Sequence, residues 1–233
     1  MNIAIIPARG GSKRIPRKNI KLFCGKPMIV WSIETALNSG CFDRVIVSTD
    51  DAEIAELAKK AGAEVPFFRP AALADDYSST QDVIVHVLSE LEKQDVDPLL
   101  VCCLYPTAPM VQVSDLQTGL TMMQQNELHY ALSVTSFPYP IQRALKINEN
   151  GRLNMFSPEF ATARSQEMVA AFHDAGQFYW GTKNAWMQRS AIFGAQSAPI
   201  LLPRYRVQDI DTPEDWLTAE LMFELITQRD LNK

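Results

Sequence analysis

The chain has 233 residues, of which 47% are hydrophobic and 21% charged, with a formal net charge of −5. This length is enough for a substantial core in one large α/β domain or two small ones, and the composition is not that of a disordered chain. No segment approaches the ~18 apolar residues of a membrane span, and the opening MNIAIIPARGG lacks the cationic and apolar regions of a signal peptide.

The basic residues are unevenly distributed along the chain. Residues 1–26 hold seven basic residues and no acidic one, so all 27 acidic residues lie beyond them. A duplex-binding surface requires a broad basic face, whereas one short basic segment on an acidic protein suits a compact polyanion such as a nucleoside triphosphate. We therefore predict neither a nucleic-acid partner nor membrane association.

Strand-like and helix-like patterns alternate through most of the chain. Strands are expected at 2–8, 44–48, 63–68, 99–104, 130–135 and 177–180. Helices are expected after Pro27, from Asp51 as N-cap to residue 60, after Ser79 or Thr80, near 113–125, and after Thr212. This order indicates a mostly parallel, doubly wound sheet, with the very apolar segment 99–104 at its centre.

The alternation fails between about residues 136 and 176. Three prolines and a glycine interrupt this region, and only short β-like pieces occur, at 144–147 and 153–156. With no repeat or flexible linker in the chain, we predict a single domain over 1–233 that carries this region as an inserted, β-rich dimerisation arm.

A loop with two glycines follows the first predicted strand. Residues 7–19 read PARGGSKRIPRKN, and ligands of doubly wound sheets bind beyond the carboxyl ends of the strands. Gly10 and Gly11 allow the backbone amides to approach anionic oxygens, and Arg9, Lys13 and Lys18 add positive charge. Neither a Walker loop nor GxGxxG is present, which disfavours a nicotinamide cofactor. The alternative is a solvated basic loop.

Two aspartates flank Ile210 just before the last predicted helix. In extended backbone, Asp209 and Asp211 face one side while Ile210 packs inward. Two carboxylates beside a triphosphate suit Mg²⁺. On chemistry alone, a helix-capping role fits Asp211 equally well. Asp50, at the end of the second strand, either orients a loop lysine or contacts the metal through water; a helix-capping role, shared with Asp51, is the alternative.

The four cysteines and the histidines indicate no metal or nucleophilic site. Cys24, Cys41, Cys102 and Cys103 fit neither a zinc site nor a disulfide framework, so we expect buried free thiols in a reducing cytoplasm. The sequence shows no Ser/His/Asp or Cys/His constellation, and covalent catalysis is not expected.

Several motifs in order resemble the CMP-sialic acid synthetase family, the cytidylyltransferases that activate nonulosonic acids. They are the loop at 7–19, FDRVIVSTD at 42–50, RP at 69–70, LADD at 73–76, PTAP at 106–109 and DIDT at 209–212. The resemblance covers nearly the whole chain. It implies a Rossmann-like nucleotidyltransferase fold, usually dimeric, that joins CTP and a sugar acid into a CMP-sugar and pyrophosphate.

The resemblance also implies site residues. The nucleotide-binding set is Ala8, Arg9, Gly10, Gly11, Ser12, Asn19, Arg69, Asp76, Ser79 and Thr80. The catalytic set is Arg9, Lys13, Lys18 and Asp211, and Asp209 with Asp211 would hold Mg²⁺. Helix capping remains the alternative for Ser79 and Thr80.

Residues that would bind the sugar acid lie after the central strand and in the arm. They are Tyr105, Arg143, Arg164, His173 and Gln177. An arginine fork matches the sugar carboxylate, and Arg164 matches the family's arginine for that role. Gln142 stands where the family has a lysine, so Arg143 is our substitute. Tyr105 and Gln177 would contact acylamino groups.

Within the family, three segments resemble the members that act on pseudaminic acid. They are RIPR at 14–17, LYPTAP at 104–109 and HDAGQFYW at 173–180. Enzymes for N-acetylneuraminic acid tend to have Gly at Arg14 and Gln at Tyr105. We therefore expect CMP-pseudaminic acid as the product, for surface glycans or flagellin. The alternatives are CMP-N-acetylneuraminate, CMP-legionaminate and, less so, the deoxy-manno-octulosonate product. An alternative from another functional class is a nucleotide-sugar-binding module without catalysis. Such a module would not need the acidic pair, so the presence of Asp209 and Asp211 argues against it.

Overall fold

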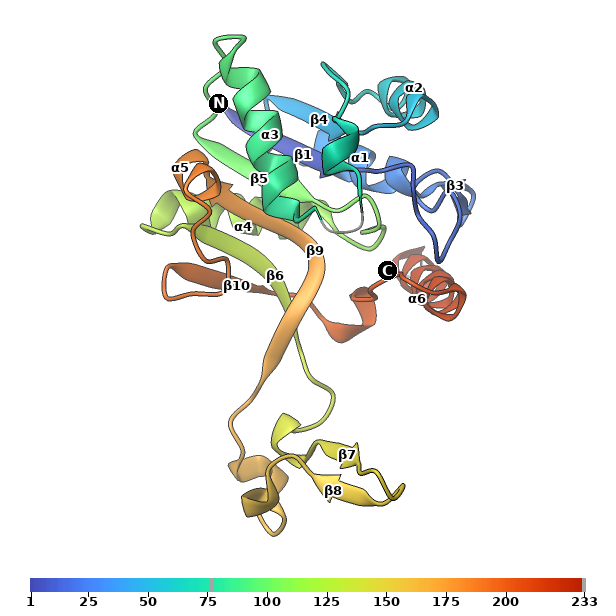
Figure 1. Cartoon of the computed structure of the whole chain (residues 1–233), viewed down its shortest axis with the longest axis vertical. Helices are drawn as coiled ribbons and strands as arrows, with labels where there is room; N and C mark the ends of the chain where they lie inside the picture. The colour runs from blue at the N-terminus through green and yellow to red at the C-terminus, as the bar shows by residue number, and fades with distance from the viewer. Residues whose placement is uncertain (76–77, 232–233) are drawn as a thin grey trace.

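A six-stranded sheet forms the centre of the molecule (Figure 1). The computed structural model describes residues 1–75 and 78–231. In spatial order the strands are β10 (Ser197–Leu201), β6 (Tyr130–Ser136), β9 (Phe172–Thr182), β5 (Leu100–Leu104), β1 (Asn2–Pro7) and β4 (Arg44–Ser48). The pairs β1–β4, β1–β5 and β6–β10 are parallel, whereas β9 is antiparallel to both neighbours. The mostly parallel sheet is confirmed, with β5 in its interior.

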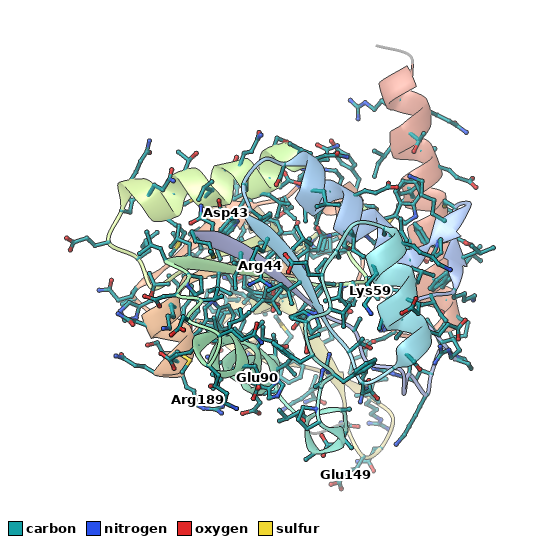
Figure 2. The ribbon with its side chains drawn as sticks, turned by 90° about the horizontal axis from the view of Figure 1, so that it is seen from above. Asp43, Arg44, Lys59, Glu90, Glu149 and Arg189 are labelled. Carbon is teal, nitrogen blue, oxygen red and sulfur yellow. The ribbon has the colours of Figure 1, made fainter. Side chains whose placement is uncertain are left out.

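Helices cover both faces of the sheet. They are α1 (Met28–Asn38), α2 (Ala52–Lys60), α3 (Thr80–Glu92), α4 (Val113–Gln125), α5 (Lys183–Met187) and α6 (Pro213–Leu231). Seen from above, the sheet separates α1 and α4 from α3 and α5, and the labelled Asp43 and Arg44 mark the start of β4 (Figure 2). Successive strand residues point to opposite faces, so Ala4 and Ile6 enter one core and Ile3 and Ile5 the other.

Three helices begin where the sequence predicts. The Asp51 carboxylate accepts the backbone N–H groups of Glu53 and Ile54, each at 3.0 Å. Ser79 and Asp82 form a capping box at the start of α3. The Thr212 hydroxyl accepts the N–H of Asp215 at 3.2 Å before α6. These caps satisfy amides that have no partner inside the helix.

The strand predicted at 63–68 is wrong. Only one bridge forms there, between Glu64 and Ile46 at the sheet edge. Pro66 lacks an N–H for further pairing, and the chain turns away so that the Arg69 N–H reaches the Thr49 carbonyl at 2.8 Å. The departure places Arg69 beneath the carboxyl end of β4.

A third apolar cluster joins the two ends of the chain. It contains Ile15, Phe23, Met28, Ile210, Trp216 and Ala219. Phe23 lies in the small hairpin of β2 (Leu22–Phe23) and β3 (Lys26–Pro27), and its ring meets that of Trp216 edge-on at 5.4 Å. This cluster packs the loop after β1 against the segment that leads into α6.

An arm projects from the sheet where β6 and β9 extend beyond it (Figure 1). It carries the hairpin of β7 (Leu145–Ile147) and β8 (Leu153–Met155), which confirms the two predicted β-like pieces. The arm also contains short 3-10 turns at Ile141–Arg143, Pro158–Phe160 and Ser165–Glu167. Two further 3-10 turns, Ala71–Leu73 and Arg204–Arg206, lie outside the arm. Across residues 1–75 and 78–231, no helix is long and apolar enough to cross a bilayer.

Candidate active site

A cleft of about 580 Å³ opens beside the loop that follows β1. Its walls come from that loop, from described residues on either side of 76–77 (Arg69, Leu73, Asp75, Ser78 and Thr80), from residues 105–107 after β5, and from Asp211. Of the predicted site residues, it brings together Arg9, Ser12, Lys13, Lys18, Asn19, Arg69, Thr80, Tyr105 and Asp211. The carboxyl ends of β1 and β5 thus lead into one concave, cationic surface.

The basic loop meets the aspartate segment directly. The Lys18 ammonium donates to the Ile210 carbonyl at 2.6 Å and lies 3.2 Å from Asp211 Oδ1. Arg14 pairs with the other oxygen of Asp211 at 2.7 Å. Ile15 and Ile210 are both buried in the third cluster, and burial of these two side chains brings the neighbouring charges together.

Acidic residues after β4 hold the other side of the loop. The sequence analysis predicted that the Gly10 amide binds an anionic ligand. In the structure, the Gly10 N–H instead donates to Asp50 Oδ1 at 3.0 Å. Arg17, at a left-handed φ of 55°, pairs with Asp51 and Glu53. The Arg17 hydrogen bond, helped by two backbone N–H groups and opposed by desolvation, lowers the pKa of Asp51 to about 2.

Arg69 is a buried cation at the floor of the cleft. Its guanidinium donates to the Ser48 hydroxyl at 3.2 Å and to the Ser48 carbonyl. Burial lowers the pKa of Arg69 to about 10, which leaves the group charged at neutral pH. A desolvated cation of this kind interacts more strongly with an anionic ligand than one in water.

Thr80 and Ser79 have separate roles at the start of α3. The Ser79 hydroxyl is used within the capping box with Asp82 and does not line the cleft. Thr80 Oγ1 lies 2.8 Å from the Tyr105 hydroxyl at the cleft wall. Burial raises the pKa of Tyr105 to about 12. The predicted nucleotide ligand Asp76 lies outside the described residues.

Asp209 and Asp211 flank the fully buried Ile210, as predicted. Asp209 reaches the surface and does not line the cleft. Displacement of water by neighbouring protein atoms and the like charge of Asp211 raise the pKa of Asp209. Two mutually repelling carboxylates beside a cationic loop fit a hard divalent cation. Within the described parts of the chain, no cluster of three His, Cys, Asp or Glu could form a richer metal site.

Other predicted residues lie outside the cleft of their own chain. Ala8 is fully buried beneath it, and the cleft lining includes neither glycine of the loop. Gln177 is buried, and its amide donates to the Arg206 carbonyl at 2.7 Å. The side chain points toward the segment before Asp209 and does not line the cleft, so its contact with the acylamino groups of the sugar stays a prediction.

The arm keeps its three predicted sugar-binding residues away from the cleft. Arg143 donates to the Ala163 carbonyl at 2.8 Å and lines a separate hollow. His173 contacts its neighbour's carbonyl at 2.8 Å and the Phe137 ring. Arg164 precedes a short turn of the arm. Sequence reasoning missed that the projecting arm separates these residues from Tyr105 within one chain.

The sequence analysis expected Asp50 to act on a loop lysine, whereas its Oδ1 accepts the Gly10 N–H. It missed two ion pairs of the loop, Arg17 with Asp51 and Arg14 with Asp211. The contacts of Asp50 and Asp51 follow from the strand register, because β1 and β4 pair with Pro7 opposite Ser48. The acidic pair after β4 must then lie beside the loop after β1.

A family model described as cytidylyltransferase matches residues 3–231. The chain belongs to the cytidylyltransferase family. A pseudaminic acid cytidylyltransferase of Campylobacter jejuni is 47% identical over 96% of this chain and 97% of its own length. A CMP-N,N'-diacetyllegionaminic acid synthase of Legionella pneumophila is 30% identical over 96% of both chains.

The fold of this cytidylyltransferase matches solved structures as well. A CMP:2-keto-3-deoxy-manno-octonic acid synthetase complexed with CTP superposes with a TM-score of 0.71 at 19% identity, covering 96% of this chain and 98% of the other. The resemblance stated from the motifs, and the nucleotidyltransferase fold that it implied, are confirmed.

Proposed function

We propose that this cytidylyltransferase transfers CMP from CTP to pseudaminic acid, with release of pyrophosphate. The observation that carries the proposal is the single cleft that joins the cationic loop after β1, the buried Arg69 and the Asp211 carboxylate. The 47% identity to an enzyme named for pseudaminic acid supports the choice of sugar acid.

The reaction needs alignment and charge neutralisation more than covalent work by the protein. The anomeric hydroxyl oxygen of the sugar acid bonds to the α-phosphorus of CTP, and the bond to the pyrophosphate oxygen breaks. Arg9, Lys13 and Lys18 line the cleft where phosphate charge would lie, and they stabilise the leaving group. The proton of the hydroxyl passes to Asp211, the aspartate of the pair that lines the cleft.

Asp209 and Asp211 would hold a magnesium ion. When bound, Mg²⁺ supplies positive charge against the triphosphate and acts as a Lewis acid. In this structure Lys18 and Arg14 neutralise Asp211 from the loop side. We propose that this pairing keeps the carboxylate pointed at the phosphate site.

We propose a homodimer in which the arm of one chain reaches the cleft of the other. Arg143 and Arg164 lie on the arm, away from the cleft of their own chain, and an arginine fork suits the sugar carboxylate. A second copy would bring these cations to Tyr105.

The product would serve surface-glycan or flagellin glycosylation, and we propose a cytoplasmic location for the enzyme. The four cysteines are free thiols, three of them buried, which fits a reducing compartment.

The test is an assay of pyrophosphate release with purified protein, CTP and Mg²⁺. Pseudaminic, legionaminic and N-acetylneuraminic acids are supplied in parallel, and the products are identified by mass spectrometry. We expect turnover with pseudaminic acid at the highest kcat/KM. A higher kcat/KM for another acid would reassign the substrate, and nucleotide binding without pyrophosphate release would favour a binding module.

Asp211→Ala tests the assignment of the carboxylate. We expect turnover to fall by about 10²–10³, the size typical for loss of one charge-stabilising group, while CTP binding remains measurable. Asp97→Ala is the matched control, because this carboxylate is 81% exposed and pairs with Lys183 away from the cleft. Near-normal turnover of Asp211→Ala with Mg²⁺ would remove Asp211 from the mechanism.

A further inference from the structure

A buried serine of α1 holds the chain at the point where it leaves the central strand β5. The Ser32 side chain is fully buried, and its hydroxyl donates to the Tyr105 carbonyl at 2.8 Å. Tyr105 is the first residue after β5 and lines the cleft, whereas Ser32 does not. Ser32 therefore acts on the cleft wall from behind.

The Tyr105 carbonyl needs a hydrogen-bond donor from outside the sheet. Continued by two residues, the register of β5 with β1 brings Tyr105 opposite Pro7. Pro7 has no N–H to donate, and the N–H of Ala8 donates to the Ser48 carbonyl at 2.9 Å, on the β4 side. The Ser32 hydroxyl thus supplies a hydrogen bond that these two residues of β1 and its loop do not offer.

Ser32 is also the polar exception on the buried face of α1. The other buried residues of this helix are apolar: Met28, Ile29, Ile33 and Ala36. A hydroxyl buried among such side chains is unfavourable unless it is hydrogen-bonded. A serine inside a helix commonly bonds the carbonyl one turn earlier, but Ser32 reaches a carbonyl 73 residues away in sequence. A serine at this position is therefore explained by Tyr105 and not by the helix.

The backbone of Tyr105 is held on both sides. Its N–H donates to the Gln177 carbonyl of β9 at 2.8 Å, and its carbonyl accepts the Ser32 hydroxyl from α1. Pro106 follows and restricts Tyr105 to extended backbone. These three constraints fix the direction in which the Tyr105 side chain leaves the chain, with its hydroxyl 2.8 Å from Thr80 Oγ1 at the cleft wall.

We propose that Ser32 is a positioning residue: by holding the Tyr105 carbonyl, it places the Tyr105 side chain against the sugar acid. The inference rests on the proposed function and on the predicted contact of Tyr105 with the acylamino groups, and it deepens that function. The cations proposed to bind the phosphates of CTP belong to other segments, residues 9–18 and Arg69. Loss of the Ser32 hydrogen bond should therefore weaken the sugar acid more than CTP.

Two variants of Ser32 and one control test this role. Ser32→Ala removes the hydroxyl and leaves the Tyr105 carbonyl without this donor. Ser32→Cys keeps nearly the same volume and offers only a weak S–H donor. Ser39→Ala is the matched control, because it removes a buried hydroxyl at the end of the same helix, one that donates to the Ala36 carbonyl at 2.6 Å and does not line the cleft.

We expect Ser32→Ala to raise the KM for the sugar acid about tenfold, the cost of one hydrogen bond, with kcat and the KM for CTP nearly unchanged. Ser32→Cys should raise the same KM by less, and it decides the test if Ser32→Ala does not fold. Ser39→Ala should leave all three constants unchanged. A KM for the sugar acid equal to that of Ser39→Ala, a rise confined to the KM for CTP, or a fall in kcat alone would overturn the proposal.

A double-mutant cycle separates positioning from general damage. If Ser32 acts through the Tyr105 side chain, Ser32→Ala causes no further rise of the KM for the sugar acid in a Tyr105→Ala background. Effects that multiply would overturn the proposal even if each single variant is impaired. Calorimetric CTP binding and thermal unfolding of each variant check the site and the fold without turnover. Absence of pyrophosphate release by the unmodified enzyme would refute the proposed function, whereas unchanged constants in the Ser32 variants would refute only the role of Ser32.

Discussion

Gly10 has no room for a side chain at the point where the loop crosses α2. A Cβ added there would lie 2.7 Å from Asp51 Oδ2 and 3.0 Å from Asp51 Cβ, whereas a Cβ on Gly11 would meet no atom within 4 Å. We expect Gly10→Ala to lose about 1–3 kcal/mol of unfolding free energy through overpacking and to raise the KM for CTP. Gly11→Ala should unfold like the unmodified protein. Thermal unfolding and steady-state kinetics of the pair check this, and equal stability of both variants would contradict it.

Lys18 is the loop cation that joins the cleft to the aspartate segment through two contacts. Its ammonium bonds the Ile210 carbonyl and Asp211, and the side chain lines the cleft. We expect Lys18→Ala to lower kcat by about 10²–10³. Lys21→Ala is the matched control, because Lys21 lies over the Trp216 ring at 4.3 Å and outside the cleft. The comparison is made by pyrophosphate release, and equal kcat for the two variants would remove Lys18 from the reaction.

At the scale of elements, the ion pair between Arg17 of the loop and Asp51 at the start of α2 makes the stability of the fold depend on pH. Arg17 holds the pKa of Asp51 at about 2, below its ordinary value, so deprotonated Asp51 stabilises the folded state. This stabilisation is present above pH 4 and is lost as the pH falls toward 2. Asp51→Asn keeps a side chain able to cap α2 but removes the charge, and we expect it to cost on the order of 1–2 kcal/mol at pH 7.

Denaturant unfolding between pH 7 and pH 2 measures this contribution. The difference in unfolding free energy between the unmodified protein and Asp51→Asn should shrink as the pH falls below 4. A difference that stays constant to pH 2 would mean that the ion pair with Arg17 contributes nothing.

Local patterns predicted the elements whose partners lie close in the sequence. Asp51, Ser79 and Thr212 cap helices because each accepts amides of its own next turn, and that requirement is visible in the residue order. The segment 63–68 and the antiparallel direction of β9 depend on what lies beside them in the sheet. Residue patterns do not contain that information.

At the scale of the whole molecule, the site depends on packing between distant segments. The charges of residues 9–18 and the pair at 209–211 were recognisable, but their meeting depends on Ile15 and Ile210 sharing one apolar cluster. Thr80 at the start of α3 and Tyr105 after β5 likewise meet at the cleft wall, with their hydroxyl oxygens 2.8 Å apart. Residue types indicate the chemistry, and only the fold shows which groups touch.

The arm allows the proposed homodimer to be tested. Its hairpin exposes Ile147 and Leu153, at 73% and 67%, and a contiguous apolar surface of this kind is typical of an interface. We expect the unmodified enzyme to sediment at twice the 26.1 kDa of one chain. An Ile147→Asp, Leu153→Asp double variant should sediment as a monomer that binds CTP but has lost most turnover, because the arm cations no longer reach a partner's cleft. Asn150→Asp and Gln166→Asp, at exposed positions of the arm, control for added charge. A fully active monomer, unmodified or variant, would contradict the shared site and leave each cleft complete on its own.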